Sequence, residues 1–464
     1  MISFNQLFYT KGGVIISSMT FIAIAVSKLT QTLSKHLLKG GSNFPGRVAL
    51  KIDPHILKHI SKNYKVILIT GTNGKTTTTS MIANILTEKG FDVVTNSTGA
   101  NMLPGIVSCF IENYSFTEKS GERYAVIEVD EANVKFITEH IKPEIINITN
   151  LFRDQLDRYG EVYTTLNKIM EGIVKVPDTK LVLNGDESLF GNLNLPNPIV
   201  YYGFEQSTNK NNEIDINADA KFCKVCKAPY KYNFITYNHL GDFYCTNCGY
   251  SRPELTYRVE SIDSATSESS SFTINGASFS LNQGGVYNIY NALCAYSISK
   301  ELNIPDSVIL SSFSHQESSF GRQEIIDIRG KKVKIILVKN PAGYNQALET
   351  IMLSQEPASL TFLLNDNYAD GTDISWIWDV NFEDLTSVDL KEIVIGGDRL
   401  YDMSVRLKVA GLDIGKFKVS DNFENLTDNI SNSTGAVNYV LATYTAMINY
   451  RKYLHSKGYI KKLW

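Results

Sequence analysis

The 464-residue chain lacks the features that would direct it into or across a membrane. Its most apolar run, residues 12–29, contains several Ser and Thr residues and falls short of the about 20 mostly apolar residues that a spanning helix needs. No small-residue cleavage site follows it, so it does not resemble a secretory signal. With 43% hydrophobic and 20% charged residues, the chain can form two or three packed domains. We expect a globular cytoplasmic protein in which residues 12–29 form an amphipathic or buried helix.

Acidic residues are almost absent from residues 1–65, where nine Lys and Arg accompany Asp53 alone. This segment carries +8, and the rest of the chain carries −11, since the whole carries −3. Such a basic end fits an anionic surface, because each cation near an anionic bilayer contributes about 1 kcal/mol. The alternative is that these cations form a solvated surface that partly offsets the negative charge of the rest of the chain. We expect residues 1–48 to form a basic, apolar helical segment that can rest on the inner face of the membrane.

Cysteine is scarce, yet four of the six cysteines are paired in sequence. The segments CKVC and CTNC are separated by 18 residues, which is the spacing of a four-thiolate zinc ribbon. Each C-x-x-C turn directs two sulfurs to one point, and the aromatic stretch between the turns predicts a hairpin. A closed four-sulfur site indicates structural zinc, and disulfides are the minor alternative because no secretion signal is evident. The expected zinc ligands are Cys223, Cys226, Cys245 and Cys248.

Strand-like and helix-like segments alternate along the chain, which is typical of α/β proteins with parallel sheets. A ligand is then expected beyond the carboxyl ends of the strands. We predict residues 1–48 as the N-terminal segment, an α/β ATP-binding domain at 49–320 with the zinc ribbon inserted at 221–253, and a C-terminal α/β domain at 321–464. The expected strands are 66–70, 93–95, 124–129, 145–149, 181–183, 333–338, 360–364, 392–397 and 437–445.

The segment VILITGTNGKTTTTSM (66–81) predicts a strand that enters a helix through a glycine turn. The common pattern G-x-x-x-x-G-K-[ST] would need a glycine at Ile69, so this loop is two residues shorter. Backbone N–H groups and the helix N-terminus still converge where a phosphate can bind. Lys75 would reach the β- and γ-phosphates and the Thr76 hydroxyl would bind Mg²⁺, whereas a plain strand-turn-helix is the alternative. The expected nucleotide-binding residues are Gly71, Thr72, Asn73, Gly74, Lys75, Thr76 and Thr77.

A second strand-like segment, YAVIEVDEA, ends in acids. By the two-residue period of a strand, Glu128 and Asp130 should project from one face. A carboxylate at a strand end opposite a phosphate-binding loop is where a metal ligand or water-positioning group belongs. Glu128 is therefore predicted to be catalytic and to bind Mg²⁺. An ordinary acidic turn is the alternative for Asp130 and Glu131.

The shortened loop GTNGKT resembles the G-T-[NK]-G-K-T loop of the Mur ligase superfamily. The segment NITNLFRDQLDRYG is similar to the family's T-N-x-x-x-D-H-x-D segment, with Asp154 and Asp157 one helical turn apart and Gln155 in place of a metal-binding His. In GGVYNIYNALCAY, which is similar to the adenine-contacting H-N-x-x-N-A segment, Asn291 takes the adenine position. FGRQE carries Arg322 as the hinge arginine.

Two departures narrow the resemblance to one family. VKNPAGYNQAL (338–348) replaces the ligases' D-Y-A-H-x-P segment, and we expect no separate UDP-sugar domain before the phosphate-binding loop. The MurT family of lipid II isoglutaminyl synthase subunits combines these features with a four-cysteine ribbon. The resemblance implies ATP-dependent amidation, through an acyl phosphate, of the D-glutamate α-carboxylate in the lipid II stem peptide to D-isoglutamine. Ammonia would come from a GatD-like glutamine amidotransferase subunit, and lipid II would be met at the membrane surface.

The residues themselves are compatible with this reaction. A carboxylate is a poor acyl donor, and a phosphate-binding loop that faces Mg²⁺ ligands can activate it by delivering a γ-phosphoryl group. No glutaminase nucleophile is evident, because Cys109 and Cys294 lie in apolar helical settings without a glycine-flanked elbow. By the resemblance, Asp373 of DGTDISW would complete the partner's Cys-His pair, although this segment is also a good turn sequence. Trp376 and Trp378 nearby would be interface anchors or core residues.

Two other functions fit parts of the sequence. A self-sufficient amino-acid ligase, similar to folylpolyglutamate synthases, would add an amino acid without an amidotransferase. A nucleotide-switched zinc-ribbon module would bind nucleic acid through the ribbon and the basic end. The composition of the ribbon argues against nucleic-acid binding, because the ribbon is not strongly basic. Between its first and last cysteines lie three Lys, one Asp and no Arg. Steep salt dependence of binding would identify that second function.

Overall fold

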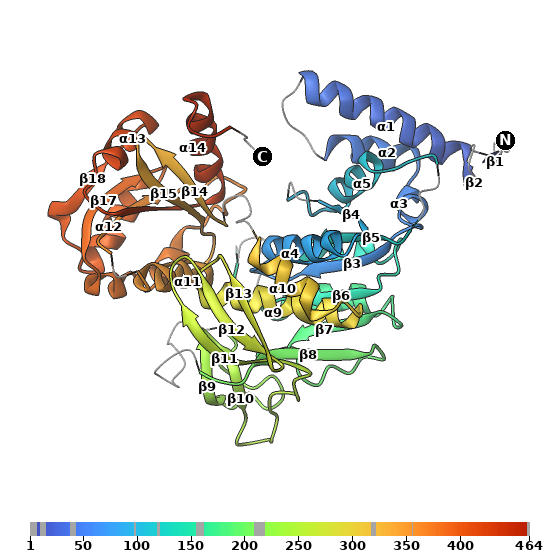
Figure 1. Ribbon diagram of the computed structural model, residues 1–464, viewed down its shortest axis with the longest axis horizontal. Coiled ribbons are helices and arrows are strands. Elements are labelled where there is room, and N and C mark those ends of the chain that lie inside the picture. The colour runs from blue at the N-terminus through green and yellow to red at the C-terminus, as the bar shows by residue number, and fades with distance from the viewer. Residues whose placement is uncertain are drawn as a thin grey trace.

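The computed structural model describes residues 7–9, 15–37, 43–96, 99–117, 121–154, 162–207, 219–316, 322–354 and 356–461. Two β-sheet domains lie side by side, with the first coloured blue to yellow and the C-terminal one orange to red (Figure 1). They come together near helices α9 (Val286–Glu301) and α11 (Pro341–Met352). A cavity lined by residues of both domains lies at this junction.

The first domain is built on a nine-stranded mixed sheet with the order β13-β12-β11-β8-β7-β6-β3-β5-β4. The strands from β4 to β11 pair in parallel, and β12 and β13 add an antiparallel edge. All five strands expected from the sequence in this region are present, within two residues at their ends. The bounds are β3 Lys65–Thr70, β4 Asp92–Thr95, β5 Arg123–Glu128, β6 Ile145–Ile148, β7 Lys180–Asn184, β8 Ile199–Phe204, β11 Tyr257–Ala265, β12 Ser270–Ile274 and β13 Ala277–Leu281.

Helices cover both faces of this sheet, because its central strands are apolar on both sides. One core packs under α4 (Lys75–Glu88), α9 and α10 (Asp306–Ser314). The other packs under α5 (Leu103–Glu112), α6 (Val134–Ile137) and α8 (Val162–Ile173). A 3-10 turn, η1 (Glu131–Asn133), follows β5. The sheet is therefore a buried platform whose carboxyl ends carry the loops of the site.

The N-terminal elements pack on α5 of the first domain (Figure 1). A small hairpin of β1 (Leu7–Tyr9) and β2 (Ile15–Ser17) precedes α1 (Ser18–Leu37), which is followed by α2 (Phe44–Ile52) and α3 (Ile56–Ile60). The helix expected at residues 12–29 therefore begins at Ser18. The boundary expected after residue 48 falls inside α2. Among the described helices, none combines the length and the apolar character that crossing a bilayer requires.

The cysteine ribbon is a hairpin of β9 (Lys231–Tyr237) and β10 (Leu240–Tyr244). Isolated bridges between Phe222 and Pro229 and between Tyr244 and Ser251 close the two turns that carry the cysteines. The hairpin lies below β8 and β11 at the edge of the first domain (Figure 1). Its own small core consists of aromatic and cysteine side chains: Cys223, Tyr230, Tyr232, Ile235, Phe243, Cys245 and Tyr250.

The C-terminal domain has a six-stranded sheet with the order β14-β15-β19-β16-β17-β18, which is parallel except for β14. The strand expected at 437–445 ends at Ala442, because α14 begins at Tyr444. Trp376 packs in the core against Tyr344, whereas Trp378 is 50% exposed. The bounds are β14 Arg322–Ile328, β15 Lys331–Leu337, β16 Ala358–Leu363, β17 Leu390–Gly396, β18 Phe417–Val419, β19 Val437–Ala442, α12 Leu400–Val409, α13 Phe423–Ser431, α14 Tyr444–Ser456, η2 Ser375–Asp379, η3 Phe382–Ser387 and η4 Ile414–Lys416.

Candidate nucleotide site between the two domains

The glycine loop between β3 and α4 has the backbone that its sequence predicts. Gly71 and Gly74 adopt φ angles of +119° and +87°, which L side chains rarely adopt. A Cβ atom at Gly71 would lie 2.4 Å from Thr149 Oγ1, and one at Gly74 would lie 2.2 Å from Asn291 Oδ1. Both positions therefore require glycine, and the second glycine brings the loop directly against α9. Helix α4 begins at Lys75, so its free N–H groups face the loop.

A neighbouring segment, residues 149–154 after β6, holds the loop in place. The backbone N–H of Asn73 donates to Asn150 Oδ1 at 2.9 Å, and the N–H of Thr72 donates to the Asn150 carbonyl at 2.9 Å. In return, the N–H of Phe152 donates to Thr72 Oγ1 at 3.0 Å. The segment that resembles the family's T-N-x-x-x-D motif therefore positions the glycine loop through hydrogen bonds.

Lys75 is buried and surrounded by acceptors. Its Nζ lies 2.8 Å from Glu131 Oε1 and also donates to the carbonyls of Gly71 and Thr72. Burial alone would lower the pKa of Lys75, but Glu131, Glu128 and then Asp130 raise it above its ordinary value. Lys75 therefore stays charged at neutral pH and can exchange one of these acceptors for a phosphate oxygen.

The two residues predicted to bind Mg²⁺ lie together. Thr76 Oγ1 donates to Glu128 Oε2 at 2.8 Å, and Asn101 Nδ2 donates to Glu128 Oε1 at 3.2 Å. A hydroxyl and a carboxylate at the end of a phosphate loop are the oxygen ligands that suit Mg²⁺. β5 ends at Glu128, and Asp130 lies beyond it, where its side chain caps η1 by accepting from the N–H of Ala132.

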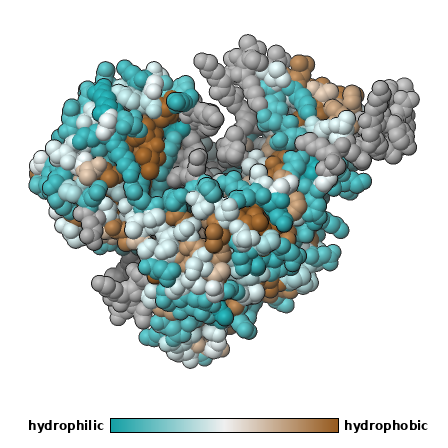
Figure 2. Space-filling view, viewed as in Figure 1, coloured by the Kyte–Doolittle hydropathy of each residue, from teal (hydrophilic) through white to brown (hydrophobic). Residues whose placement is uncertain are grey.

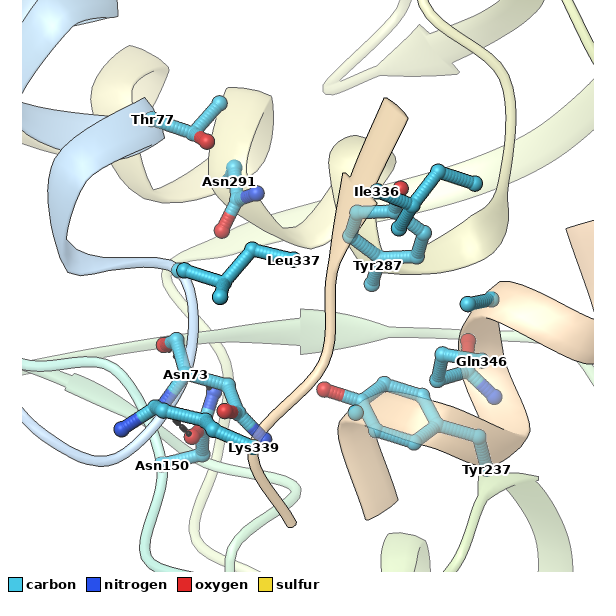
Figure 3. A pocket seen from close by; sticks show the side chains of 13 residues that line it. Asn73, Thr77, Asn150, Tyr237, Tyr287, Asn291, Ile336, Leu337, Lys339 and Gln346 are labelled. Carbon is cyan, nitrogen blue, oxygen red and sulfur yellow. Dashed lines mark hydrogen bonds between the residues drawn. The ribbon is translucent and has the colours of Figure 1, made fainter. Parts of the chain in front are cut away.

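A cavity opens beside the loop where the two domains meet (Figure 3). Asn291 faces it and accepts from Thr78 Oγ1 at 3.3 Å. The C-terminal domain contacts the loop beside the cavity through Asn340, whose side-chain amide exchanges two hydrogen bonds with that of Asn73, at 3.0 and 3.3 Å. The lining residues are Asn73, Gly74, Thr77, Asn150, Tyr237, Tyr287, Asn291, Ile336, Leu337, Lys339, Gly343, Gln346 and Ala347.

Two ion pairs also cross between the domains. Lys339, which follows β15, pairs with Asp154 of the 149–154 segment. Arg153 pairs with Asp219 and reaches Asp379 of the C-terminal domain at 3.6 Å. Gln155 and Asp157 lie outside the described residues. Arg322 begins β14, but its side chain is also outside them.

The four expected zinc ligands form one cluster, with their sulfur atoms within 4.8 Å of one another. The Sγ atoms of Cys223 and Cys248 are 3.6 Å apart, and those of Cys226 and Cys245 are 3.4 Å apart. A Zn–S bond of about 2.3 Å implies a tetrahedral S–S separation of about 3.8 Å, so the cluster fits a zinc-sized ion. Both turns have the same design, since the residue after the second cysteine has a positive φ in each, 65° at Lys227 and 75° at Gly249.

Three further residues named in the sequence analysis, Cys109, Cys294 and Asp373, differ in exposure. Cys109 and Cys294 are buried, and burial raises the pKa of both thiols to about 12, so neither is a thiolate at neutral pH. Asp373 is exposed, and its Oδ1 accepts from the N–H of Ser375 at 2.8 Å. That backbone hydrogen bond lowers the pKa of Asp373, so it is ionised.

Three residues of the site were not predicted from the sequence. Glu131 was given only as part of an acidic turn, yet it is the acid that binds Lys75. Lys339 directly follows the apolar segment at 333–338, so the rule that ligands lie at the carboxyl ends of parallel strands could have identified it. Tyr237 lines the cavity from the ribbon hairpin, and no motif indicated that the ribbon reaches this far.

Comparisons with solved structures show the fold. The pseudomurein peptide ligase type C of Methanothermus fervidus has 22% identity and a TM-score of 0.63, covering 87% of this chain and 80% of its own. A MurF structure from Acinetobacter baumannii has 15% identity and a TM-score of 0.64, covering 89% and 80%. At these identities the similarity concerns the fold alone.

Sequence comparisons identify the family. Residues 69–251 match the Mur ligase middle domain and residues 337–447 the MurT ligase C-terminal family. The lipid II isoglutaminyl synthase (glutamine-hydrolyzing) subunit MurT of Streptococcus pneumoniae R6 is 43% identical over 91% of this chain and 94% of its own length. The subunit of that name from Staphylococcus aureus COL is 34% identical over 84% and 88%. The chain therefore belongs to the MurT family of the Mur ligase superfamily and is an ATP-dependent ligase.

Proposed function

We propose that this protein amidates the α-carboxylate of D-glutamate in the stem peptide of lipid II, which gives D-isoglutamine at the expense of ATP. The observation that carries the proposal is the 43% identity over nearly the whole length of both chains to a subunit named for this synthesis. The geometry of the domain junction supports it. A triphosphate would bind in a site made of the glycine loop, the buried side chain of Lys75 and the Thr76–Glu128 pair.

The loop end of the cavity is suited to activate a carboxylate. The N–H groups at the start of α4 and the charge of Lys75 would bind the β- and γ-phosphates. Thr76 and Glu128 would hold Mg²⁺, which would neutralise charge on the phosphates. The substrate carboxylate oxygen attacks the γ-phosphorus and ADP leaves, which produces an acyl phosphate. Ammonia then attacks the acyl carbon, phosphate leaves, and the nitrogen loses a proton to give the amide.

Lys339 supplies a second positive charge from the opposite domain. It lines the cavity and is paired with Asp154, and Oδ1 of that aspartate is buried without a hydrogen-bond partner among the described residues. When a triphosphate binds, Lys339 can turn from Asp154 toward the γ-phosphate. Its position on the C-terminal side of a two-domain junction would tie phosphate binding to alignment of the domains.

Ammonia must be supplied to this chain, because its two cysteines outside the ribbon are protonated in buried settings. We propose a glutamine amidotransferase subunit of the GatD type as the source. Asp373 is exposed and ionised, so it can orient a histidine of such a partner. Asp373→Asn should lower glutamine-driven amidation by at least about 100-fold and leave ammonia-driven amidation unchanged. Equal loss with both nitrogen sources would contradict this role.

The N-terminal helix offers a contact with the membrane that carries lipid II. Its outward face is entirely apolar over three turns, and Figure 2 shows brown side chains in this region. Five large side chains on α1 are at least 36% exposed: Met19, Phe21, Ile22, Val26 and Leu29. The +8 charge of residues 1–65 would favour an anionic surface. We propose that the protein lies in the cytoplasm with α1 on the inner face of the membrane.

Vesicle sedimentation tests this contact. The double variant Ile22→Ser with Leu29→Ser should lose binding to anionic phosphatidylglycerol vesicles and keep activity on a soluble lipid II analogue. Val174→Ser, which changes another exposed apolar residue at 57% exposure, is the matched control and should bind normally. Binding that is unchanged in the double variant would rule out the α1 contact.

Reconstitution tests the reaction itself. The purified chain is combined with a GatD-type amidotransferase, lipid II, glutamine and ATP, and the product is analysed by mass spectrometry. Replacement of the carboxyl OH by NH₂, with release of one ADP per amide, is the expected result. Addition of a whole amino acid would instead identify a self-sufficient ligase. No change in lipid II while ATP binds would show that the substrate is different.

A further inference from the structure

The turn of the ribbon hairpin is buried, although connections between strands usually lie on the protein surface. Thr236, Tyr237 and His239 are each at most 3% exposed. Leu240 pairs with Tyr237 beside the turn, so the four cysteines lie at the other, open end of the hairpin. The hairpin therefore connects the metal-binding end of the ribbon with a buried end inside the first domain.

One side of the buried turn contacts the segment that holds the glycine loop. His239 Nε2 lies 2.8 Å from Glu187 Oε2, and the same carboxylate oxygen accepts from the N–H of Leu151 at 3.2 Å. The ring of Phe152 stacks on that of Tyr237 with centroids 5.8 Å apart. Leu151 and Phe152 directly follow Asn150, which holds the phosphate loop. The position of the hairpin thus fixes the position of this segment.

The other side of the turn contacts helix α9. Thr236 Oγ1 lies 2.5 Å from the hydroxyl of Tyr290, and the rings of Tyr237 and Tyr290 meet edge to face with centroids 5.6 Å apart. Tyr290 precedes Asn291, which faces the cavity. The hairpin turn is therefore packed between the two elements that form the site in the first domain.

Tyr237 itself enters the cavity. It lies on the same side as Tyr287 and Gln346, and across the cavity from Asn73 and Asn150 of the phosphate end (Figure 3). Its hydroxyl is directed into the cavity and has no hydrogen-bond partner among the residues that the structure describes. Burial raises the pKa of this phenol, so the hydroxyl remains a neutral donor.

We infer that the ribbon hairpin is a working part of the nucleotide site: the Tyr237 hydroxyl binds the nucleoside moiety, and metal binding at the four cysteines strengthens nucleotide binding by holding the hairpin in place. The inference rests on the proposed function only in taking ATP as the occupant of this cavity. Because coupling between two sites is reciprocal, nucleotide should also slow the loss of metal from the ribbon.

The variant Tyr237→Phe separates binding from folding. It keeps the ring that packs on Phe152 and removes only the hydroxyl that faces the cavity. We expect its affinity for a non-hydrolysable ATP analogue to fall by about three- to tenfold, as for the loss of one neutral hydrogen bond, with unchanged thermal stability. Its affinity for inorganic tripolyphosphate should be unchanged. Tyr244→Phe, at the open end of the same hairpin, is the matched control and should bind both ligands normally.

Metal removal tests the second half of the inference. The full chain is treated with a chelator, its zinc content is measured by mass spectrometry, and its fold is checked by circular dichroism. A metal-free, folded protein should bind the ATP analogue at least tenfold more weakly than the metal-loaded protein, and added analogue should slow zinc release. If the metal-free chain unfolds, Tyr237→Phe with its metal bound still decides the nucleoside contact.

The outcomes distinguish this inference from the proposed function. If the unaltered protein fails to bind the ATP analogue, the proposed function is wrong. If it binds, and both Tyr237→Phe and the folded metal-free protein bind equally well, the ribbon is only a structural support and this inference is wrong. Equal weakening of ATP analogue and tripolyphosphate in Tyr237→Phe would also overturn the nucleoside contact.

Discussion

Two buried acid–base pairs of the first domain differ in how many protein donors and acceptors they engage. Glu187 is fully buried and accepts from His239 and from the backbone N–H groups of Leu151 and Leu189. Lys75 instead pairs with Glu131 and with two carbonyls of its own loop. The first pair joins three chain segments. In the second pair, Lys75 donates to protein acceptors that lie where phosphate oxygens would bind.

One small region can thus be rigid at one pair and ready to bind phosphate at the other. A buried carboxylate that already accepts hydrogen bonds from several protein groups gains no stability by exchanging them for other donors. A lysine whose partners include its own loop carbonyls loses little when a phosphate replaces them, because a charged hydrogen bond is exchanged for a stronger one.

Glu187→Ala should cause the largest loss of stability. It removes one partner of a fully buried pair and leaves Nε2 of His239 and the N–H of Leu151 without an acceptor. The free energy of unfolding should fall by about 3–5 kcal/mol, as measured by urea denaturation. Glu139→Ala, which removes the acid of an exposed pair with Lys175, is the control and should change little. A small effect at Glu187 would mean that the two buried pairs do not differ as described.

Lys75→Ala should cause the largest loss of activity. Removal of a preorganised charge at a developing negative centre typically lowers the rate by about 100- to 1,000-fold. We expect this loss in ATP-dependent amidation, with weaker binding of the ATP analogue and a folded protein by circular dichroism. Lys65→Ala, which removes a half-exposed lysine paired with Glu122, should retain full activity. Full activity of Lys75→Ala would disprove the phosphate role of the loop.

Glu131→Gln should make nucleotide binding sensitive to alkaline pH. In the unaltered protein, Glu131, Glu128 and Asp130 together outweigh burial and raise the pKa of Lys75. Without Glu131, burial lowers that pKa, so Lys75 loses its proton at a lower pH. The affinity for the ATP analogue, measured by calorimetry between about pH 7 and 10, should decline earlier in the variant than in the unaltered protein. Parallel pH profiles would show that Glu131 does not maintain the charge of Lys75.

These residues also show what a sequence can and cannot predict. The conformation of the glycine loop and the clustering of the four cysteines were predictable, because each depends on local spacing that a short motif records. Nine strands of the two sheets were predicted from apolar runs, whereas β8, β11, β12, β13, β14 and β18 were not predicted. The cap that Asp130 forms on η1, just past the end of β5, is not indicated by strand period.

Contacts between distant segments were not predictable in the same way. Glu131 reaches Lys75 across 56 residues, and His239 reaches Glu187 across 52. Lys339 reaches Asp154 across 185 residues. Which residues pair in this way depends on how strands and loops meet in three dimensions. Periodicity and motif spacing do not contain that information. The position of Tyr237 in the cavity also depends on contacts between distant segments and could not be predicted from a motif.

His239 should give the smallest effect, which is visible only as a pH dependence of stability. Burial opposes its positive charge, but Glu187 and then Asp219 raise its pKa above the ordinary 6.5. A raised pKa in the folded state means that protonation stabilises the fold. That contribution is complete below about pH 6.5 and is lost as the pH rises through the raised value.

Subtraction isolates this effect from other titrating groups. The free energy of unfolding of His239→Gln is subtracted from that of the unaltered protein at each pH, and the difference should shrink as the pH rises above about 6.5. The same subtraction for His59→Gln, which changes an exposed histidine, should stay flat. A difference for His239 that grows with pH would mean that this histidine is neutral in the fold, and the pair with Glu187 would then be a neutral hydrogen bond rather than an ion pair.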